Sequence, residues 1–361
     1  MAIVYAEHFR KYSAIADLAA NNDDLNSNVW TNTGMGLTTS TGRFGQTALD
    51  ATGTASLTRF RLGAANIVGS TMIVSAHLKW NNIDTVSQSQ LSPLMAIGST
   101  VSQGFHAVVC IGPGGTLSLS RNHTFSVSRN LLAARVATSS ARLSSGVWHH
   151  LEMKVSLLDA GTATVRLDGV QIMTASADFL ASTTTLDSVY LGGIQQDVFW
   201  EDLLVMDGSG ATFNDFMGDF RIETALPDAD GATANWTASA GSRFQTIDDA
   251  LPLASANYDT DYISSATTDQ VNLSSHANIV ASGATAIWFA GVEALARADA
   301  AGDKLALRVF SGATGLDSAD KALINGTYRW RQRIYTVDPN TSAAWTVANV
   351  NSAEWGIKKR V

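Results

Sequence analysis

Cysteine and proline are scarce in this chain of 361 residues, which contains one cysteine and five prolines. The cysteine, Cys110, has no partner for a disulfide within the chain, so the fold must be stabilised by burial alone. We expect Cys110 to be buried in a strand that covers His106–Ile111, because an unpaired cysteine usually behaves as a small apolar residue. So few prolines exclude a long proline-rich linker.

Charge is also sparse and is mostly negative. Charged residues make up 16% of the chain, and the net charge is −8. Affinity for nucleic acid or for an anionic membrane surface requires clustered cations, so we expect neither partner. No stretch approaches the ~18 consecutive apolar residues that a membrane helix needs, and the N-terminal residues lack an apolar signal segment. We therefore expect no insertion into a membrane.

Hydroxyl side chains are abundant where charges are few. Serine and threonine together number 71, against 56 charged residues, and 45% of the chain is hydrophobic, which is enough for a core. This composition favours strands and turns. Polar and apolar residues alternate over Thr162–Asp168, with Thr162, Thr164 and Arg166 on the expected wet face. Asp168-Gly169 then predicts a tight hairpin turn.

Similar alternating segments recur along the chain, separated by stretches rich in glycine, serine and asparagine. Many short strands with little helix predict an all-β fold, either a sandwich or a barrel. The clearest expected strands are Thr71–Trp80, His106–Ile111, Thr116–Ser120, Trp148–Leu157, Ser188–Leu191 and Val198–Met206, and later Ala286–Ala298, Lys304–Phe310 and Tyr328–Val337.

The length suggests two domains, and the distribution of charge suggests where they divide. Between residues 207 and 269 there are eleven acidic residues and only two basic ones. We therefore predict a first antiparallel β-sandwich over residues 1–206, an acidic connector over 207–226, and a second, smaller β-sandwich over 227–361.

Catalytic carboxylates are not apparent on the expected strands. Glycosidases of the sandwich type need carboxylates at positions i, i+2 and i+4 of one strand, so that acid and base share a face. From Glu201 the same-face positions are Leu203, Val205 and Asp207, and the adjacent Asp202 is expected on the opposite face. No Gly-x-Ser-x-Gly motif is present to position a serine nucleophile. We therefore predict no catalytic residues and no enzymatic activity.

Metal and phosphate sites are also not predicted. Asp228–Gly231 resembles the beginning of a calcium loop, but the later ligands are missing, so an acidic turn is favoured. Whether the acidic loops, including Asp259–Asp261, bind calcium is left open. His149 and His150 are expected to face opposite ways on a strand, which prevents joint binding of zinc. Gly112–Gly115 lacks the Lys-Ser/Thr of a phosphate loop and predicts a turn between two strands. We expect no cofactor.

Three arginines alternate along the expected strand Tyr328–Val337. Arg329, Arg331 and Arg333 fall on one face and form a cationic stripe. The stripe is a candidate contact with the carboxylates of another subunit, because arginine binds carboxylates in a planar, bidentate manner. Pairing with the acidic residues of 207–269 within the same chain is the favoured alternative.

Two motifs in the first half resemble those of known sandwiches. Gly146–Glu152, which contains Trp148, and Val165–Gly169 resemble the tryptophan strand and the Asp-Gly hairpin of concanavalin A-like lectin and glucanase domains, including laminin-G-type modules. The resemblance covers about residues 1–206. It implies a jelly-roll sandwich in which Trp148 opens a strand at the sheet edge.

Further motifs resemble structural proteins of tailed bacteriophages. They are Phe199–Asp207, Asn214–Asp219, Leu226–Asp228, Asn235–Thr237 and Asp338–Thr346. The resemblance implies a virion protein in which a lectin-like sandwich precedes a smaller β-domain. Such proteins serve as tail-fibre, tail-tip or head-surface decoration components, and they offer no catalytic residues to carry over.

The expected function is that of a non-enzymatic virion structural protein, made in the cytoplasm of a host bacterium and active in assembly and host adhesion. Its expected partners are other virion proteins, further copies of the chain, with a trimer preferred, and bacterial surface glycans. Two alternatives stay open. One is a carbohydrate-binding module for bacterial glycans, and the other is a polysaccharide-degrading enzyme.

Overall fold

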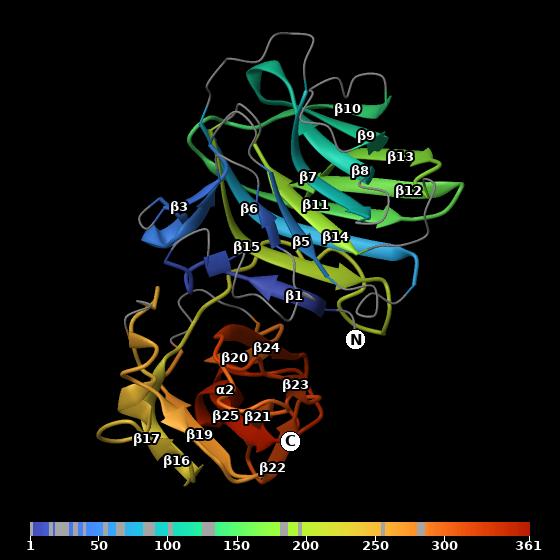
Figure 1. Cartoon of the computed structure of the whole chain (residues 1–361). Coiled ribbons are helices and arrows are strands. Elements are labelled where there is room, and N and C mark those ends of the chain that lie inside the picture. Colours follow the sequence, from blue (N-terminus) through green and yellow to red (C-terminus); the bar gives the residue numbers. More distant parts are fainter. Residues whose placement is uncertain are drawn as a thin grey trace. The chain divides into compact units, whose positions relative to one another are not determined.

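The chain forms two β-rich units in the computed structural model (Figure 1). The first comprises the described residues up to Ile222, and the second runs from Glu223 to Val361. Residues 207–222 of the predicted connector thus group with the first unit. The structure describes residues 3–13, 17–18, 29–31, 35–38, 41–52, 57–62, 69–81, 91–99, 104–124, 134–180, 187–193, 197–253, 257–279 and 286–361.

Two antiparallel sheets make up the described part of the first unit. One has the order β13 (Val170–Ala177), β12 (Gly161–Leu167), β11 (Trp148–Ser156), β6 (Thr71–Asn81), β15 (Asp197–Asp207), β4 (Ala48–Asp50) and β3 (Gly36–Thr38), and β1 (Ile3–Glu7) also pairs with β15. The other has the order β10 (Arg135–Arg142), β9 (Thr116–Thr124), β8 (Gly104–Ile111), β7 (Ser92–Ser99), β14 (Ser188–Gly192), β5 (Leu57–Arg61) and β2 (Val29–Thr31). The predicted antiparallel β-sandwich is confirmed.

Strand β6 shows how the two faces of the first sheet differ. Met72, Val74, Ala76 and Leu78 are fully buried and apolar, so this face belongs to the core. The other face carries polar residues, among them His77, which are also largely buried. A polar sheet face that is shielded from water needs internal hydrogen-bond partners, and these define the site described below.

Several local predictions are confirmed. Asp168 and Gly169 connect β12 to β13 with φ of 51° and 78°, the left-handed backbone of a tight hairpin. Cys110 is buried in β8, and Gly112–Gly115 forms the turn between β8 and β9, including a short 3-10 helix. Trp148 does open a strand, but β11 lies between β6 and β12, so the expected edge position is wrong.

The second unit is a smaller two-layered β-domain. Its main sheet has the order β16 (Pro227–Ala234), β19 (Val271–His276), β25 (Glu354–Arg360), β21 (Lys304–Ser311) and β22 (Thr314–Asp317), with β23 (Lys321–Ala322) paired to β21. Two further pairs are β20 (Ala290–Ala296) with β24 (Arg329–Tyr335), and β17 (Thr237–Ala238) with β18 (Ile263–Ser264).

The core of the second unit joins its layers. Val292 of β20 and Tyr335 of β24 pack in one cluster with Leu305 and Leu307 of β21 and with Trp345. The predicted second sandwich is therefore confirmed. The α-helix α2 covers Val347–Ser352, and no helix in the described ranges is long and apolar enough to cross a membrane.

Candidate functional site

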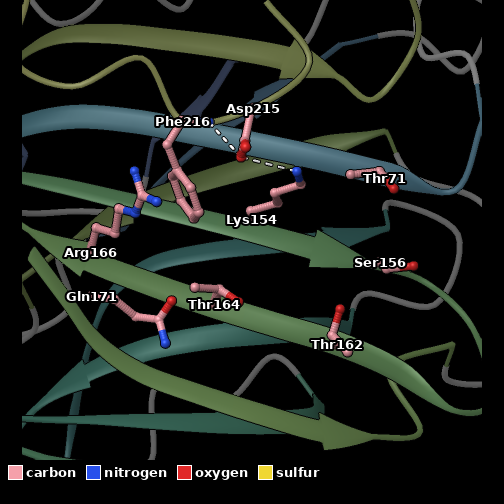
Figure 2. A pocket seen from close by; sticks show the side chains of 9 residues that line it. All are labelled: Thr71, Lys154, Ser156, Thr162, Thr164, Arg166, Gln171, Asp215 and Phe216. Carbon is pink, nitrogen blue, oxygen red and sulfur yellow. Dashed lines mark hydrogen bonds and ion pairs between the residues drawn. The ribbon is translucent and has the colours of Figure 1, made fainter. Parts of the chain in front are cut away.

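A polar groove lies on the first sheet of the first unit (Figure 2). Its volume is about 320 Å³. It combines hydroxyl groups, one amide, two cations, one carboxylate and one aromatic ring, from Thr71, Lys154, Ser156, Thr162, Thr164, Arg166, Gln171, Asp215 and Phe216. The strands β6, β11, β12 and β13 form its floor, and residues 215–216 form one wall. This mixture can hydrogen-bond to sugar hydroxyls, pair with acidic groups and pack against a sugar ring.

Strand alternation explains how the floor is assembled. Residues two apart on a strand share a face, and the register places Lys154 opposite Thr164 and Arg166 opposite Gln171. The wet face predicted for Thr162, Thr164 and Arg166 is the floor of this groove. The predictions include no role for Lys154 or for the wall, because only the sheet register and the fold of the chain after β15 bring them there.

The two cations of the groove both contact the wall. Lys154 Nζ lies 3.0 Å from Asp215 Oδ1, and a dashed line marks this ion pair in Figure 2. The guanidinium carbon of Arg166 lies 4.2 Å from the centre of the Phe216 ring. Partial burial opposes ionisation of Asp215, but hydrogen bonds from the Phe216 amide and from Lys154 outweigh it, so the pKa of Asp215 is lowered. Asp215 is therefore a carboxylate at neutral pH.

The wall continues as residues 215–222, here called the cover segment, across the same sheet face. This segment has no regular secondary structure, and buried side chains of the sheet accept hydrogen bonds from its backbone amides. Glu152 Oε1 accepts hydrogen bonds from the amides of Met217 and Gly218 at 3.1 and 3.2 Å. Asp202 Oδ1 accepts from the amide of Ile222 at 3.1 Å.

Two histidines lie beneath the cover segment. The rings of His77 on β6 and His150 on β11 stack with their centres 4.7 Å apart, and the ring of Phe220 packs against both. His77 Nε2 lies 2.7 Å from Asp219 Oδ1, and His150 Nε2 lies 2.6 Å from Ser75 Oγ. We call Ser75, His77, His150 and Glu152 the imidazole cluster, and each of them is at most 3% exposed.

Four buried polar atoms at the cluster have no hydrogen-bond partner within the described part of the chain. They are Nδ1 of His77 and of His150, Oε2 of Glu152, and Oδ2 of Asp202. These atoms face one another in pairs: His77 Nδ1 lies 3.9 Å from Asp202 Oδ2, and His150 Nδ1 lies 3.9 Å from Glu152 Oε2. Both distances exceed a hydrogen bond.

Burial keeps both imidazoles neutral. Burial, and then the neighbouring His77, lower the pKa of His150 from its ordinary 6.5 to about 3. Burial also lowers the pKa of His77, although its hydrogen bond to Asp219 opposes this change. Burial raises the pKa of Glu152. A neutral imidazole has a nitrogen that can accept a proton, but a pKa near 3 makes His150 a weak base in this buried state.

The expected separation of Glu201 and Asp202 is wrong. The pairing of β15 with β6 shifts register between Glu201 and Leu204, and Asp202 has a left-handed φ of 50°. Because of this bulge both carboxylates approach Arg43: its backbone amide donates to Glu201 Oε2, and its Nη1 lies 3.9 Å from Asp202 Oδ2. Burial, and then repulsion from Asp202, raise the pKa of Glu201 to about 7.

The other predicted candidates lie elsewhere. His149 and His150 do face opposite ways, since His149 Nδ1 contacts Asp168 at 2.7 Å. Asp228–Gly231 is part of strand β16 rather than a turn, and Asp230 accepts hydrogen bonds from Arg243 and from the Phe244 amide. Across the described ranges, no group of three or more histidine, cysteine or acidic side chains is arranged to hold a metal ion.

The arginine stripe lies on β24. Arg331 is 2% exposed and donates to the backbone carbonyl of Ala322. Arg329 donates to the carbonyl of Tyr328, and the Arg333 guanidinium lies 5.3 Å from the Tyr335 ring centre. A role of Arg329, Arg331 and Arg333 in contacts between subunits stays a prediction.

Comparisons with known proteins give a match only at the level of structure. No family model and no curated protein matches the chain. A double mutant of alginate lyase Aly36B in complex with alginate tetrasaccharide is 9% identical, over 56% of this chain and 96% of the lyase, with a TM-score of 0.37. An endo-β-1,4-glucuronan lyase from the fungus Trichoderma reesei is 13% identical, over 52% of this chain and 94% of the lyase, with a TM-score of 0.39. A Trypanosoma rangeli sialidase is 10% identical, over 48% of this chain and 27% of the sialidase, with a TM-score of 0.34.

Two predictions are corrected at this point. The protein was expected to be a non-enzymatic virion structural protein, but the similar structures named above are polysaccharide lyases and a sialidase. The physical reason lies in the chain itself. The prediction of no enzymatic activity assumed that β15 is a regular strand. The bulge in β15 instead brings the carboxylates of Glu201 and Asp202 together beside His77.

Proposed function

We propose that the first unit binds an acidic polysaccharide in the groove and degrades it. The lining of the groove carries this proposal. Lys154 and Arg166 match the acidic groups of such a chain, the hydroxyl groups and Gln171 match its sugar hydroxyls, and Phe216 offers a ring face. The open, polar shape also suits a polymer better than a small apolar ligand.

The imidazole cluster supports a reaction in addition to binding. Glu152 of the cluster and Lys154 of the groove are two residues apart on β11, so they share the same sheet face. His150 is neutral and lies on the adjoining part of this face, where the carboxylate of a bound uronate would raise its low pKa. It would then take up the proton from the carbon beside that carboxylate, while the bond to the leaving sugar oxygen breaks and that oxygen takes a proton from water. Degradation of a polysaccharide was one of the alternatives left open by the sequence. With an acidic polysaccharide as substrate, it is the function that the site supports best.

The test is product release from defined polysaccharides. The protein is incubated with a polyuronate and with a neutral glucan, and reducing ends and the ultraviolet absorbance of unsaturated uronates are measured. We expect products from the polyuronate only. The double variant K154A/R166A should lose binding and products, whereas Arg135→Ala, which removes an exposed strand arginine outside the groove, should lose neither.

A second variant separates chemistry from binding. His150→Gln keeps a polar group that can bond to Ser75 but cannot act as the base, so it should bind the polyuronate and release no products. His149→Gln is its control on the opposite face of the same strand. Binding without any product from the unaltered protein would refute degradation, and the absence of binding would refute the groove as well.

Assembly and location stay predictions. A homotrimer, contacts with other virion proteins and incorporation into a virion are compatible with a glycan-degrading first unit, as is a bacterial surface glycan as the substrate. Light scattering of the purified protein measures the number of subunits, and a monomer at micromolar concentration would contradict the trimer.

A further inference from the structure

In this structure the groove is partly occupied by the protein itself. The carboxylate of Asp215 lies against the Lys154 ammonium group, and the ring of Phe216 lies against the Arg166 guanidinium. Both partners come from the first two residues of the cover segment. A carboxylate on Lys154 is also the contact that an acidic sugar would make, so Asp215 stands where a substrate carboxylate would bind.

These groove contacts are accessible to a competing ligand. The side chains of Lys154 and Asp215 are 33% and 66% exposed, and ion pairs with this degree of exposure are weak because water screens them. A polymer that brings several acidic and hydroxyl groups to the groove at once can therefore replace a single carboxylate. Asp215 is adjacent in sequence to the residues that shield the imidazole cluster, so its displacement acts on them directly.

The remainder of the cover segment is held by side-chain contacts. The Phe220 ring packs on His77 and His150, and Arg43 donates to the Phe220 carbonyl at 3.1 Å. Glu152 binds two amides of the segment, Asp202 binds a third, and His77 binds Asp219. Asp219 also accepts from Arg43 at 3.1 Å. No strand pairing fixes the segment, which lacks regular secondary structure throughout. The cover segment is thus held by side chains that could also form hydrogen bonds with a bound substrate.

Several buried polar atoms of the sheet beneath the cover segment have no hydrogen-bond partner in the described part of the chain. They belong to His77, His150, Glu152 and Asp202. Buried polar atoms are normally paired, and those that are not indicate a partner or a functional role that the observed state does not supply. Hydroxyl groups of a sugar, which both donate and accept hydrogen bonds, have the chemistry to pair with all four.

We propose that residues 215–222 are a displaceable cover over the imidazole cluster, and that an acidic glycan releases it by replacing Asp215 on Lys154. This inference rests on the proposed function and specifies how the same site is controlled. In the closed state the cluster is shielded from water and from neutral sugars. Binding of a polyuronate in the groove moves the cover segment and gives the polyuronate access to His150.

Hydrogen exchange tests the release directly. The amides of Met217, Gly218 and Ile222 report on the cover segment, because they donate to Glu152 and Asp202. A saturating polyuronate should accelerate exchange at these amides and leave the amides of β25 in the second unit unchanged, and a neutral glucan should do neither. Unchanged or slower exchange of the three amides at saturation would overturn the proposal.

Asp215→Asn tests the competition. Removing the carboxylate should tighten polyuronate binding by roughly two- to fivefold, the change expected for loss of an exposed ion pair. It should also accelerate exchange of the three reporter amides without any ligand. Asp299→Asn is the matched control, since Asp299 forms a similarly exposed pair with Arg297 in the second unit, and it should change neither quantity.

The two proposals fail in different ways. If the unaltered protein binds no polyuronate, the proposed function is wrong, while exchange in ligand-free Asp215→Asn still shows whether Asp215 holds the cover segment. If the polyuronate binds but Asp215→Asn alters neither its affinity nor the ligand-free exchange, the proposed function stands. The displaceable cover is then wrong.

Discussion

A single left-handed residue changes the chemistry of one strand. In a regular β15, Glu201 and Asp202 would lie on opposite faces. The φ of 50° at Asp202 and the register shift after Glu201 instead bring both carboxylates toward Arg43. Burial disfavours the charged form of Glu201, and repulsion from the neighbouring Asp202 disfavours it further. The pKa of Glu201 is therefore raised to about 7.

Glu201 should therefore make stability depend on pH. The unfolded side chain loses its proton near pH 4.5, whereas the folded one keeps it until about pH 7, so the free energy of unfolding falls as pH rises between these values. The fall due to this group amounts to about 3 kcal/mol. Glu201→Gln cannot ionise and should lack this part of the fall.

Chemical denaturation at a series of pH values measures the effect. The difference between the free energies of unfolding of the unaltered protein and of Glu201→Gln should change between pH 4.5 and 7 and then stay constant. Using the difference cancels the contributions of His77 and His150, whose lowered pKa values act in the opposite direction. A difference that does not vary with pH would show that Glu201 titrates normally.

At the scale of elements, the hairpin of β12 and β13 supports the groove and the cluster together. Its Asp168 accepts from the His150 amide at 2.8 Å and contacts His149 at 2.7 Å, which holds the turn against the first residues of β11. Thr164, Arg166 and the rest of the groove floor follow from the register that this turn imposes.

The turn depends on a residue that tolerates positive φ. Gly169 has φ of 78°, which costs a residue with a Cβ atom about 1–2 kcal/mol. Gly169→Ala should therefore lower the free energy of unfolding by about that amount. Gly36→Ala is its control, because the added Cβ would meet only Asp50 at an ordinary 3.7 Å. Equal effects of the two substitutions in urea denaturation would contradict a specific role of the turn.

At the scale of the molecule, each unit has its own core. In the second unit Leu307 is fully buried in a cluster with Tyr335 and Trp345. The groove and the imidazole cluster draw all their described residues from the first unit. Loss of stability in the second unit should thus leave the structure of the site in place.

Leu307→Ala tests this independence. Removing a buried leucine side chain from a packed core costs about 2–5 kcal/mol. Calorimetry should show a lower unfolding temperature for one of two transitions, while the other transition and binding to the groove stay unchanged. A single transition that shifts as a whole would show that the units unfold together.

Residue patterns were sufficient for several of the longer strands. The alternation at Thr162–Asp168 and the Asp-Gly pair predicted β12, the turn and the wet face that became the groove floor. Such features depend on neighbours in sequence, whose side chains alternate wherever the backbone is extended. The same rule failed at Asp202, because a bulge interrupts the alternation and leaves no clear mark in the local sequence.

The sequence by itself determined the all-β class, the sandwich, the hairpin and the burial of Cys110, because composition, alternation and turn residues act over short distances. Only the tertiary structure decided the site. His77, His150 and Phe220 come from distant parts of the chain, and their meeting depends on the order of strands in the sheet and on where residues 215–222 return across it. Strand order follows from the packing of the whole core, which no local pattern encodes.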